Sequence, residues 1–228
     1  MRIKSLTDIG KSRKENQDNY WSALLNINGL EAGFVCLCDG MGGLNDGGLA
    51  SKMVVEAIRD GVLHGLSFPE LEGVLHQVNK NIFEYAKELN QQMGTTCTLI
   101  QCYNSRYDIM HVGDSRCYLL SAGKYTSLTV DHSALKKYGI TRENNFDLWR
   151  KYKNCLTRCI GVKESVEVDK YSGSYTAGEG FLLCSDGMWH YIDSNRVSLA
   201  QLDNLRDTFD LCMYDGEVDN MTGCLLYV

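Results

Sequence analysis

A short apolar run constrains the fold of this chain more than any other feature. Residues 33–38 read Gly-Phe-Val-Cys-Leu-Cys, and the run stops at Asp39 and Gly40. A continuous apolar segment of this length is typical of a β-strand that is covered on both faces. The sequence therefore predicts a layered fold with a buried sheet, in which one strand ends at an aspartate beside a glycine turn.

Two amphipathic helices are expected after this strand. Apolar residues recur at helical spacing over 50–62, and the segment 67–70, Ser-Phe-Pro-Glu, forms a capping box before a second apolar stripe over 71–89. The short connection makes the two helices antiparallel neighbours. Each helix has a single apolar stripe, which most simply packs on a sheet.

Short strands account for most of the remaining chain. Apolar segments bounded by turns predict strands within 3–25 and at 96–102, 107–112, 117–121, 125–128, 166–171, 181–184 and 224–228. The four strands between residues 96 and 128 suggest a β-meander. Residues 133–154 are polar and irregular, which indicates an insertion over one edge, and two short helices are expected within 195–213. The 228 residues contain no linker or repeat, so we expect a single domain over 1–228.

Composition excludes several partners. The chain has 23 basic and 29 acidic residues and a formal charge of −6, with no dense basic run, which argues against binding to nucleic acid or to an anionic membrane. It contains no run of about 18 apolar residues and no apolar core of a signal peptide near its first residue, so we expect a cytoplasmic protein. We also expect a monomer. Most of its ten cysteines lie in apolar runs, where free thiols pack as small hydrophobic groups.

Four aspartates stand at the ends of apolar runs. Asp39, Asp114 and Asp186 follow such runs, and Asp219 precedes the last one. Because the end of one antiparallel strand lies beside the start of its neighbour, these carboxylates can gather at one edge. Gathered carboxylates repel one another, and Mg²⁺ or Mn²⁺ would supply the counter-charge. A single Asp-Gly pair is more often a hairpin turn, but two Asp-Gly pairs, a Gly-Asp-Ser and an Asp-Asn, each beside an apolar run, together favour a metal site.

Eight segments resemble, in order, the motifs of a known family. They are residues 13–18 (RKENQD), 39–43 (DGMGG), 94–96 (GTT), 112–116 (VGDSR), 131–133 (DHS), 156–161 (LTRCIG), 181–187 (FLLCSDG) and 219–222 (DNMT). With them the chain resembles the metal-dependent serine/threonine protein phosphatases, the PPM or type 2C family, over essentially its whole length. The resemblance implies an α+β fold, in which a central antiparallel β-sandwich is flanked by antiparallel helix pairs in α/β/β/α layers.

The resemblance also implies a binuclear metal centre. Asp39 would bridge two Mn²⁺ or Mg²⁺ ions, the backbone carbonyl of Gly40 would bind one of them, and Asp186 and Asp219 would complete the other. Asp114, together with Asp186, matches the place where many bacterial members hold a weaker third ion. Two such ions lower the pKa of a shared water and neutralise phosphoryl oxygens, so that the water can attack phosphorus in line.

Further positions match the family in part. Asp18 would order metal-bound waters, and Arg13 would bind the substrate phosphate through its bidentate guanidinium. Gln17 stands where many members have a glutamate that holds a metal through water, so we expect weaker metal affinity. Met41 replaces a histidine of animal members, as is common in bacterial ones. His132 is one candidate for the general acid, although a histidine beside an aspartate is more often structural.

The implied activity is hydrolysis of phosphoserine and phosphothreonine in proteins, without a covalent phospho-enzyme. None of the ten cysteines has an arginine six positions later, which excludes a cysteine phosphatase, and the absence of a Cys-x-x-Cys pair argues against structural zinc. The alternative is a catalytically silent relative that binds phosphoproteins, for which Gln17 is the only support. The expected partners are proteins phosphorylated by a serine/threonine kinase. Residues 133–154 match the region that the family uses as a flap beside the active site. Within this region, residues 148–153 of the present chain are basic and aromatic.

Overall fold

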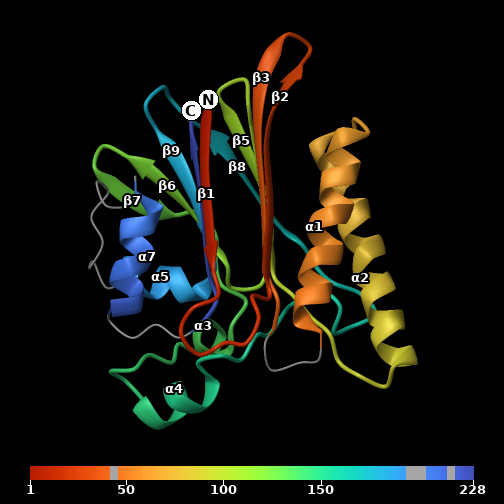
Figure 1. The fold of residues 1–228 in the computed structure, drawn as a ribbon, viewed down its shortest axis with the longest axis vertical. Coiled ribbons are helices and arrows are strands. Elements are labelled where there is room, and N and C mark those ends of the chain that lie inside the picture. The colour runs from red at the N-terminus through yellow and green to blue at the C-terminus, as the bar shows by residue number, and fades with distance from the viewer. Residues whose placement is uncertain (42–45, 194–203, 215–218) are drawn as a thin grey trace.

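Two antiparallel sheets form the centre of the molecule. The computed structural model describes residues 1–41, 46–193, 204–214 and 219–228. The first sheet has the order β1-β10-β9-β6-β7, with β1 at Arg2–Asp8, β10 at Met221–Tyr227, β9 at Gly180–Cys184, β6 at Arg116–Ser121 and β7 at Lys124–Ser127. The second has the order β2-β3-β4-β5-β8, with β2 at Asp18–Ile27, β3 at Leu30–Asp39, β4 at Cys97–Tyr103, β5 at Arg106–Val112 and β8 at Asp169–Ser174. The two sheets pack face to face (Figure 1).

Helices cover the sheets on both sides. The long helices α1 (Gly47–Leu63) and α2 (Leu71–Glu88) run antiparallel along the outer side of the second sheet, whereas α5 (Asp186–Asp193) and α7 (Leu205–Tyr214) lie against the first sheet (Figure 1). The predicted α+β sandwich with helix layers is therefore confirmed. None of the helices in the described residues is long and apolar enough to cross a membrane.

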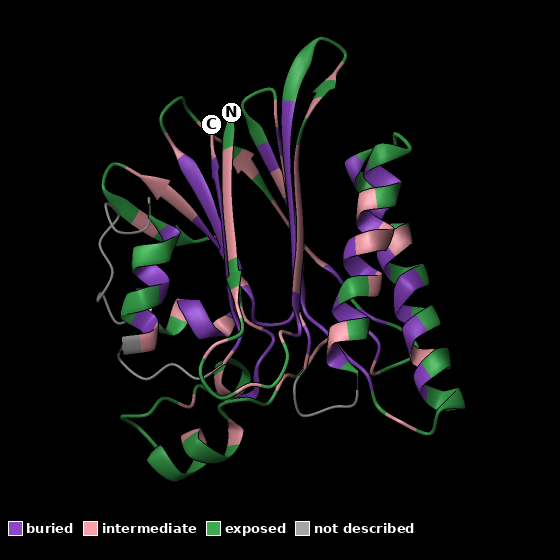
Figure 2. Ribbon diagram, viewed as in Figure 1, coloured by how far each residue is buried: buried purple, intermediate pink, exposed green. Residues whose placement is uncertain are grey.

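The layers are held by separate apolar cores. Residues 32–38 of β3 are all buried, as the apolar run predicted, because β3 is a central strand that is covered on both faces (Figure 2). Its side chains alternate between two cores: Val35 and Leu37 face the first sheet, while Phe34 and Cys36 face α1 and α2. The predicted capping box is also present, since the Ser67 backbone N–H donates to Glu70 Oε2 over 2.7 Å at the start of a short 3₁₀ turn, Phe68–Glu70, before α2.

The β-meander prediction is wrong. β4 pairs with β5 and β6 pairs with β7, but β6 lies beside β9 in the other sheet. The chain leaves the second sheet at Gly113, which has φ 111° and approaches Thr96 so closely that a Cβ would lie 2.5 Å from Thr96 Cγ2. Only glycine combines this backbone conformation with that contact.

Two helical segments also differ from the sequence-based expectation. The segment 133–154 is not irregular throughout, because it contains the short helices α3 (Ala134–Tyr138) and α4 (Phe146–Tyr152). α5 was not predicted, since its Asp-Gly start resembles a turn. Of the two helices expected within 195–213, α7 is present, and residues 194–203 lie outside the described part of the chain.

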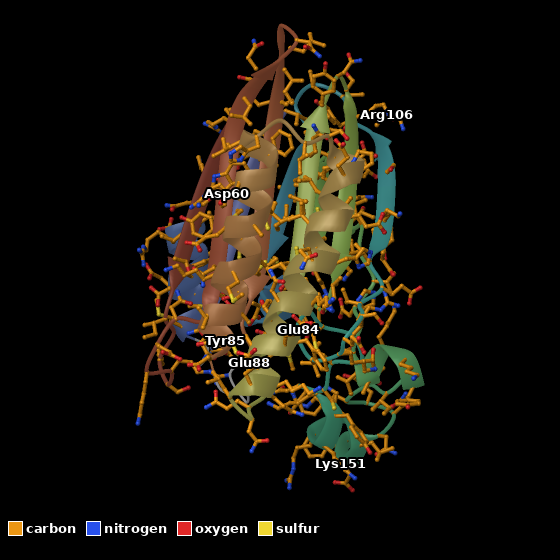
Figure 3. The ribbon with its side chains drawn as sticks, turned by 90° about the vertical axis from the view of Figure 1, so that its right-hand side faces the viewer. Asp60, Glu84, Tyr85, Glu88, Arg106 and Lys151 are labelled. Carbon is orange, nitrogen blue, oxygen red and sulfur yellow. The ribbon has the colours of Figure 1, made fainter. Side chains whose placement is uncertain are left out.

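Packing of α2 against the sheet generates a first prediction. Ile82 is fully buried on α2, whereas Tyr85 on the same helix is 41% exposed (Figure 3 labels Tyr85). Ile82→Ala should lower the free energy of unfolding by about 2–5 kcal/mol, because it removes buried methyl groups and leaves a cavity. Urea unfolding measures the change, with Tyr85→Ala as the control, expected within about 0.5 kcal/mol of the wild type. Equal effects of the two substitutions would contradict this packing.

Candidate metal centre

Aspartates from four separate segments line one cavity. Asp39 ends β3, Asp114 follows β5, Asp186 begins α5 directly after β9, and Asp219 precedes β10. The cavity has a volume of about 360 Å³ and is lined by Arg13, Asp39, Gly40, Met41, Thr96, Asp114, Asn154, Leu156, Asp186 and Asp219. Strand ends from both sheets thus bring carboxylates together that are far apart in the sequence.

Asp39 is fixed through its backbone. Its N–H donates to Thr96 Oγ1 over 2.8 Å, and its carbonyl accepts from the Thr96 N–H over 2.9 Å and from Thr95 Oγ1 over 2.9 Å. Thr96 Oγ1 also shares a hydrogen bond of 2.7 Å with Ser115 Oγ, next to Asp114. These bonds use main-chain atoms of Asp39 and leave its carboxylate directed toward the cavity that it lines.

Gly40 is required by close approach of the backbone. A Cβ at this position would lie 2.4 Å from the Gly47 carbonyl oxygen and 2.6 Å from the Gln17 carbonyl oxygen. The Gly40 N–H donates to that Gln17 oxygen over 3.1 Å. The turn after β3 therefore packs against the loop before β2 and against the start of α1, and any larger residue would separate them.

Asp18 is a buried carboxylate with one unpartnered oxygen. Its Oδ2 accepts hydrogen bonds from Ser185 Oγ over 2.8 Å and from Thr222 Oγ1 over 2.7 Å. Its Oδ1 is buried and has no hydrogen-bond partner among the described protein atoms. A buried oxygen of this kind is costly unless another group satisfies it, and a bound water or cation would do so.

The crowded carboxylates alter one another's ionisation. Burial, together with the neighbouring Asp186 and Asp219 charges, raises the pKa of Asp18 to about 7, although hydrogen bonds from Thr222 and Ser185 oppose the rise. Burial and the charges of its neighbours also raise the pKa of Asp39 well above its ordinary value, with Asp18 the largest of these charges. For Asp114, burial and then Asp186 raise the pKa. The site as folded therefore disfavours its own negative charges and favours a cation.

Arg13 supplies the positive charge that borders this cavity. Its Nε donates to Asp219 Oδ1 over 2.7 Å and its Nη2 donates to Asp219 Oδ2 over 2.5 Å, which is a bidentate pair. The hydrogen bond to Asp219, followed by the charges of Asp219, Asp186 and Asp39, raises the pKa of Arg13 against the effect of burial. The predicted phosphate-binding residue and a predicted metal ligand are thus bonded to each other.

Asn220 is a site residue that sequence reasoning missed. Its Oδ1 accepts from the Gln17 N–H over 2.9 Å, and its Nδ2 donates to the carbonyls of Ile9 over 2.9 Å and Glu15 over 3.0 Å. One side chain therefore holds both ends of the loop that carries Arg13. The polar residue directly after Asp219 was a weak signal, because its partners lie more than 200 residues away in sequence.

Gln17 and His132 do not line the cavity with Asp39. The Gln17 amide donates to Glu15 Oε1 over 2.9 Å, and its backbone carbonyl accepts from Ser51 Oγ over 2.6 Å. His132 Nδ1 accepts from the Gly113 N–H over 3.0 Å, and its Nε2 lies 3.0 Å from Asp169 Oδ2. Nδ1 of His132 thus fixes the turn before Asp114, while Nε2 contacts Asp169 on β8 and Arg158 Nη1. These contacts favour the structural interpretation of this histidine over the general-acid interpretation.

Two other arginines pair with carboxylates. Arg116 makes a bidentate contact with Asp131, at 2.8 and 2.7 Å, and its guanidinium lies 3.5 Å from the centre of the Trp189 ring. Arg158 contacts Asp169, and its Nη2 lies 3.0 Å from Glu167. Neither arginine is among the residues that line the cavity with Asp39.

The segment 133–154 lies beside the site. A second cavity shares Arg13, Asn154, Asp186 and Asp219 with the first. It extends to α4 and α5, and its other lining residues are Trp149 and Lys153 at α4, His190 on α5 and Ser12 in the loop before β2. The two cavities together form a depression with acidic side chains at its centre. Basic and aromatic side chains stand on one of its walls.

The donor set fits hard divalent cations. Carboxylate oxygens of Asp39, Asp114, Asp186 and Asp219, and the unpartnered Oδ1 of Asp18 close by, are the oxygen ligands that Mg²⁺ and Mn²⁺ prefer. The raised carboxyl pKa values show that positive charge is in deficit there, in spite of Arg13.

Known proteins resemble this chain over its whole length. The family model described as Protein phosphatase 2C matches residues 11–219. The serine/threonine phosphatase stp of Listeria welshimeri is 32% identical, over 96% of this chain and 93% of its own. Among solved structures, the serine/threonine phosphatase Stp1 from Staphylococcus aureus matches with a TM-score of 0.85 at 26% identity, covering 99% of this chain and 94% of that one. The S. agalactiae serine/threonine phosphatase matches with a TM-score of 0.79 at 29% identity, covering 100% and 99%.

The raised carboxyl pKa values predict an unusual pH dependence of stability. With a chelator present, the free energy of unfolding should fall by about 1–2 kcal/mol between pH 6.5 and 7.5. Over this range the folded protein still holds part of the protons on Asp18 and Asp39 that the unfolded chain has already lost, so raising the pH favours unfolding. The upper limit stays below the pH at which free thiols ionise, and His111 contributes mainly below the lower limit, since burial lowers its pKa to about 3 and the free histidine titrates near pH 6.5.

Urea unfolding at the two pH values measures this loss. Asp39→Asn should reduce it, because one of the repelling groups can no longer ionise, whereas the exposed Glu84→Gln on α2 should not change it (Figure 3). Stability that is constant or that rises with pH would show that the carboxylates do not repel one another as described.

Proposed function

The chain belongs to the protein phosphatase 2C family, and from that premise we propose that it hydrolyses phosphoserine and phosphothreonine in proteins with the help of two Mn²⁺ or Mg²⁺ ions. It is accordingly an enzyme, a protein serine/threonine phosphatase. The observation that carries the mechanistic proposal is the single cavity in which Asp39, Asp186, Asp219 and Arg13 meet.

The residues have separate tasks in this proposal. Asp39 would contact both ions, the carbonyl of Gly40 would contact one, and Asp186 and Asp219 would hold the other. Asp114, whose carboxylate lines the same cavity and whose charge is coupled to that of Asp186, would contribute to a third and weaker site. When bound, the two central ions supply an activated water and neutralise the oxygens of the phosphoryl group.

Asp18 and Gln17 would act around these ions. The unpartnered Oδ1 of Asp18 is suited to accept a hydrogen bond from a water, while Ser185 and Thr222 hold its other oxygen. Gln17 has a neutral amide that donates to Glu15, so it would contribute no charge to the metals. We expect the lower charge to weaken metal affinity modestly and to leave activity intact.

Arg13 would orient the substrate. A guanidinium binds phosphate oxygens in the same bidentate manner in which Arg13 now contacts Asp219. Because Asp219 is also a proposed metal ligand, a cation at Asp219 would compete with Arg13 for that carboxylate. If the cation displaced Arg13 from Asp219, the guanidinium would be free to bind a phosphoryl group in the cavity. Its positive charge would then lie beside the negatively charged phosphate of the substrate.

The silent phosphoprotein binder receives no support from the comparisons, in which the relatives are named as phosphatases. Phosphorylated proteins are therefore the proposed substrates, and a serine/threonine kinase the source of their phosphate. A single catalytic domain over 1–228, a monomeric state and a cytoplasmic location stay predictions of the sequence. So does the use of α4 and its neighbours as a flap.

Phosphate release tests the proposed reaction. A phosphothreonine peptide should lose inorganic phosphate when Mn²⁺ is present and not in a chelator. Asp39→Asn should abolish this turnover, since it removes the shared ligand, while leaving the circular dichroism spectrum unchanged. Equal rates with and without Mn²⁺ would overturn the metal mechanism, and more than a few per cent of residual activity in Asp39→Asn would overturn the role of this residue.

Substitution of Arg13 tests its proposed role. Arg13→Gln should lower kcat/KM for a phosphopeptide about 10–100-fold, the range expected when hydrogen bonds to a charged group are lost. Calorimetry should show that its Mn²⁺ affinity does not fall, because Asp219 loses a competing partner. An unchanged kcat/KM, or a parallel loss of Mn²⁺ binding, would contradict the assignment of Arg13 to the phosphate.

A further inference from the structure

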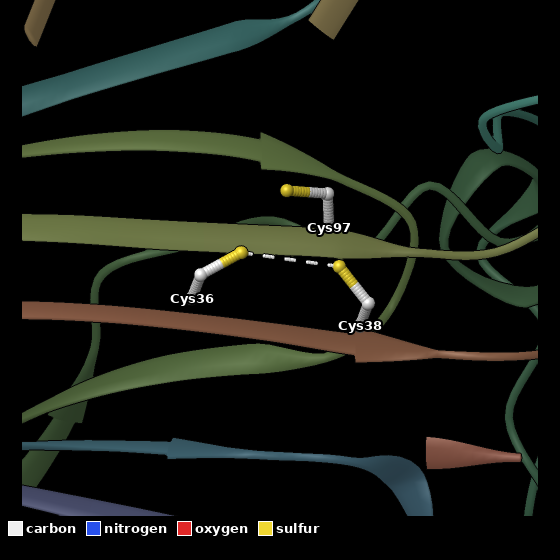
Figure 4. Close-up of side chains that lie close together, drawn as sticks. All are labelled: Cys36, Cys38 and Cys97. Atoms are coloured by element: carbon white, nitrogen blue, oxygen red, sulfur yellow. Dashed lines mark hydrogen bonds between the residues drawn. The ribbon is translucent and has the colours of Figure 1, made fainter. Parts of the chain in front are cut away.

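Three cysteines form a cluster outside the proposed metal centre. Cys36 and Cys38 lie on β3 and Cys97 begins β4, and the three Sγ atoms are all within 4.8 Å of one another (Figure 4). Cys36 Sγ and Cys38 Sγ are 4.0 Å apart. All three side chains are fully buried, in the core between the second sheet and the helices α1 and α2.

Strand register brings these sulfurs together. Leu37 of β3 is paired with Thr98 of β4, so Cys38 faces Cys97 one step further along. Cys36 is two residues before Cys38 and therefore projects from the same face of the strand. Sequence patterns did not reveal the cluster, because Cys36 and Cys38 seemed isolated in an apolar run and nothing local linked them to Cys97.

The sulfurs form a pocket that favours a cation. The thiols of Cys36 and Cys38 donate toward Cys97 and so lower the pKa of the Cys97 thiol in spite of its burial. The side chains around the three sulfurs in this core are apolar, and the described members of the core include no positively charged group that would oppose a bound cation.

We propose that Cys36, Cys38 and Cys97 form a site for a soft, three-coordinate cation, Cu(I). Ligand sets made only of sulfur select soft ions. The Sγ atoms of Cys36 and Cys38 lie 4.0 Å apart and all three sulfurs lie within 4.8 Å of one another, close to the separation of about 4.0 Å that a trigonal ion with metal–sulfur bonds of about 2.3 Å requires. A structural Zn²⁺ prefers four ligands, and within the described residues the group contains these three alone.

Binding at this site is a simple exchange of protons for the metal. Each thiol that coordinates as a thiolate releases one proton to solvent, and the copper stays in its monovalent state. Because the sulfurs are fully buried, loading requires a local opening of the strand pair or of the helix layer. Uptake is therefore slow, in contrast to uptake by the exposed thiol of Cys155.

The position of the site gives it a structural consequence. Cys38 directly precedes Asp39, and Cys97 directly follows Thr96, whose N–H and hydroxyl bond to the main chain of Asp39. An ion bound by these sulfurs would cross-link β3 and β4 at the point where they hold Asp39. It would stabilise the folded state in proportion to its occupancy. The proposal does not depend on the phosphatase activity.

Anaerobic titration of the reduced full chain with Cu(I), against a chromophoric Cu(I) chelator, tests the site. All proteins carry Cys155→Ser, which removes the exposed thiol. One equivalent should be taken from the chelator, with ultraviolet thiolate–Cu(I) absorption and a raised Tm. Cys36→Ala, Cys38→Ala and Cys97→Ala should each weaken binding at least about tenfold. The matched control is Cys102→Ala, which is equally buried on β4 outside the cluster and should bind as the parent does.

X-ray absorption on the copper-loaded parent protein provides a second measurement that does not depend on the folding of any variant. Three sulfur neighbours at about 2.3 Å are expected. Two sulfurs, or nitrogen and oxygen neighbours, would overturn the proposal. So would failure of the folded parent to take copper from the chelator, or equal uptake by a variant that lacks all three cysteines.

Discussion

Mutual repulsion of buried carboxylates is the constraint on which the rest of this structure depends. Burial, and after it the charges of neighbouring aspartates, raises the pKa values of Asp18, Asp39 and Asp114. Such an arrangement weakens the folded state unless cations offset the charge. A sandwich of two five-stranded sheets with helices on both sides holds the aspartates in this arrangement.

The scaffold holds the charges through neutral groups. Hydroxyls of Thr96, Ser185 and Thr222, together with the Asn220 amide, make the bonds that fix the aspartates and the loop bearing Arg13. Because these groups carry no charge, they fix position without cancelling the field in the cavity. Among the described residues that line the cavity, Arg13 is the cationic one, and it pairs with Asp219. A cation at the centre and a phosphoryl group beside it would therefore complete the charge balance.

Local chemistry explains which parts of this structure could be predicted. The apolar run before Asp39, the helical spacing over 50–62 and the Ser67–Glu70 capping box each depend on neighbouring residues, and all three are present in the structure. Aspartates at strand ends could be recognised as a group because the register of antiparallel strands is regular.

Features that depend on contacts between distant segments could not be predicted. The chain passes from the second sheet into the first before β6 because Gly113 packs closely against Thr96. Asn220 can bind the loop that carries Arg13 because β1 and β10 pair with each other. α5 was missed because its Asp-Gly start is locally a turn signal, and its helical form comes from packing against the first sheet. The same limit hid the cluster of Cys36, Cys38 and Cys97.

In the proposed mechanism, strand ends from the two sheets form one site for two divalent ions that share Asp39. Anomalous diffraction from crystals grown with Mn²⁺ tests this site. Two peaks about 3.5–4 Å apart are expected, with the Asp39 carboxylate between them and Asp186 and Asp219 on one of the two ions. Density with no peak within bonding distance of Asp39, or Mn²⁺ bound solely away from this cavity, would rule out the shared site.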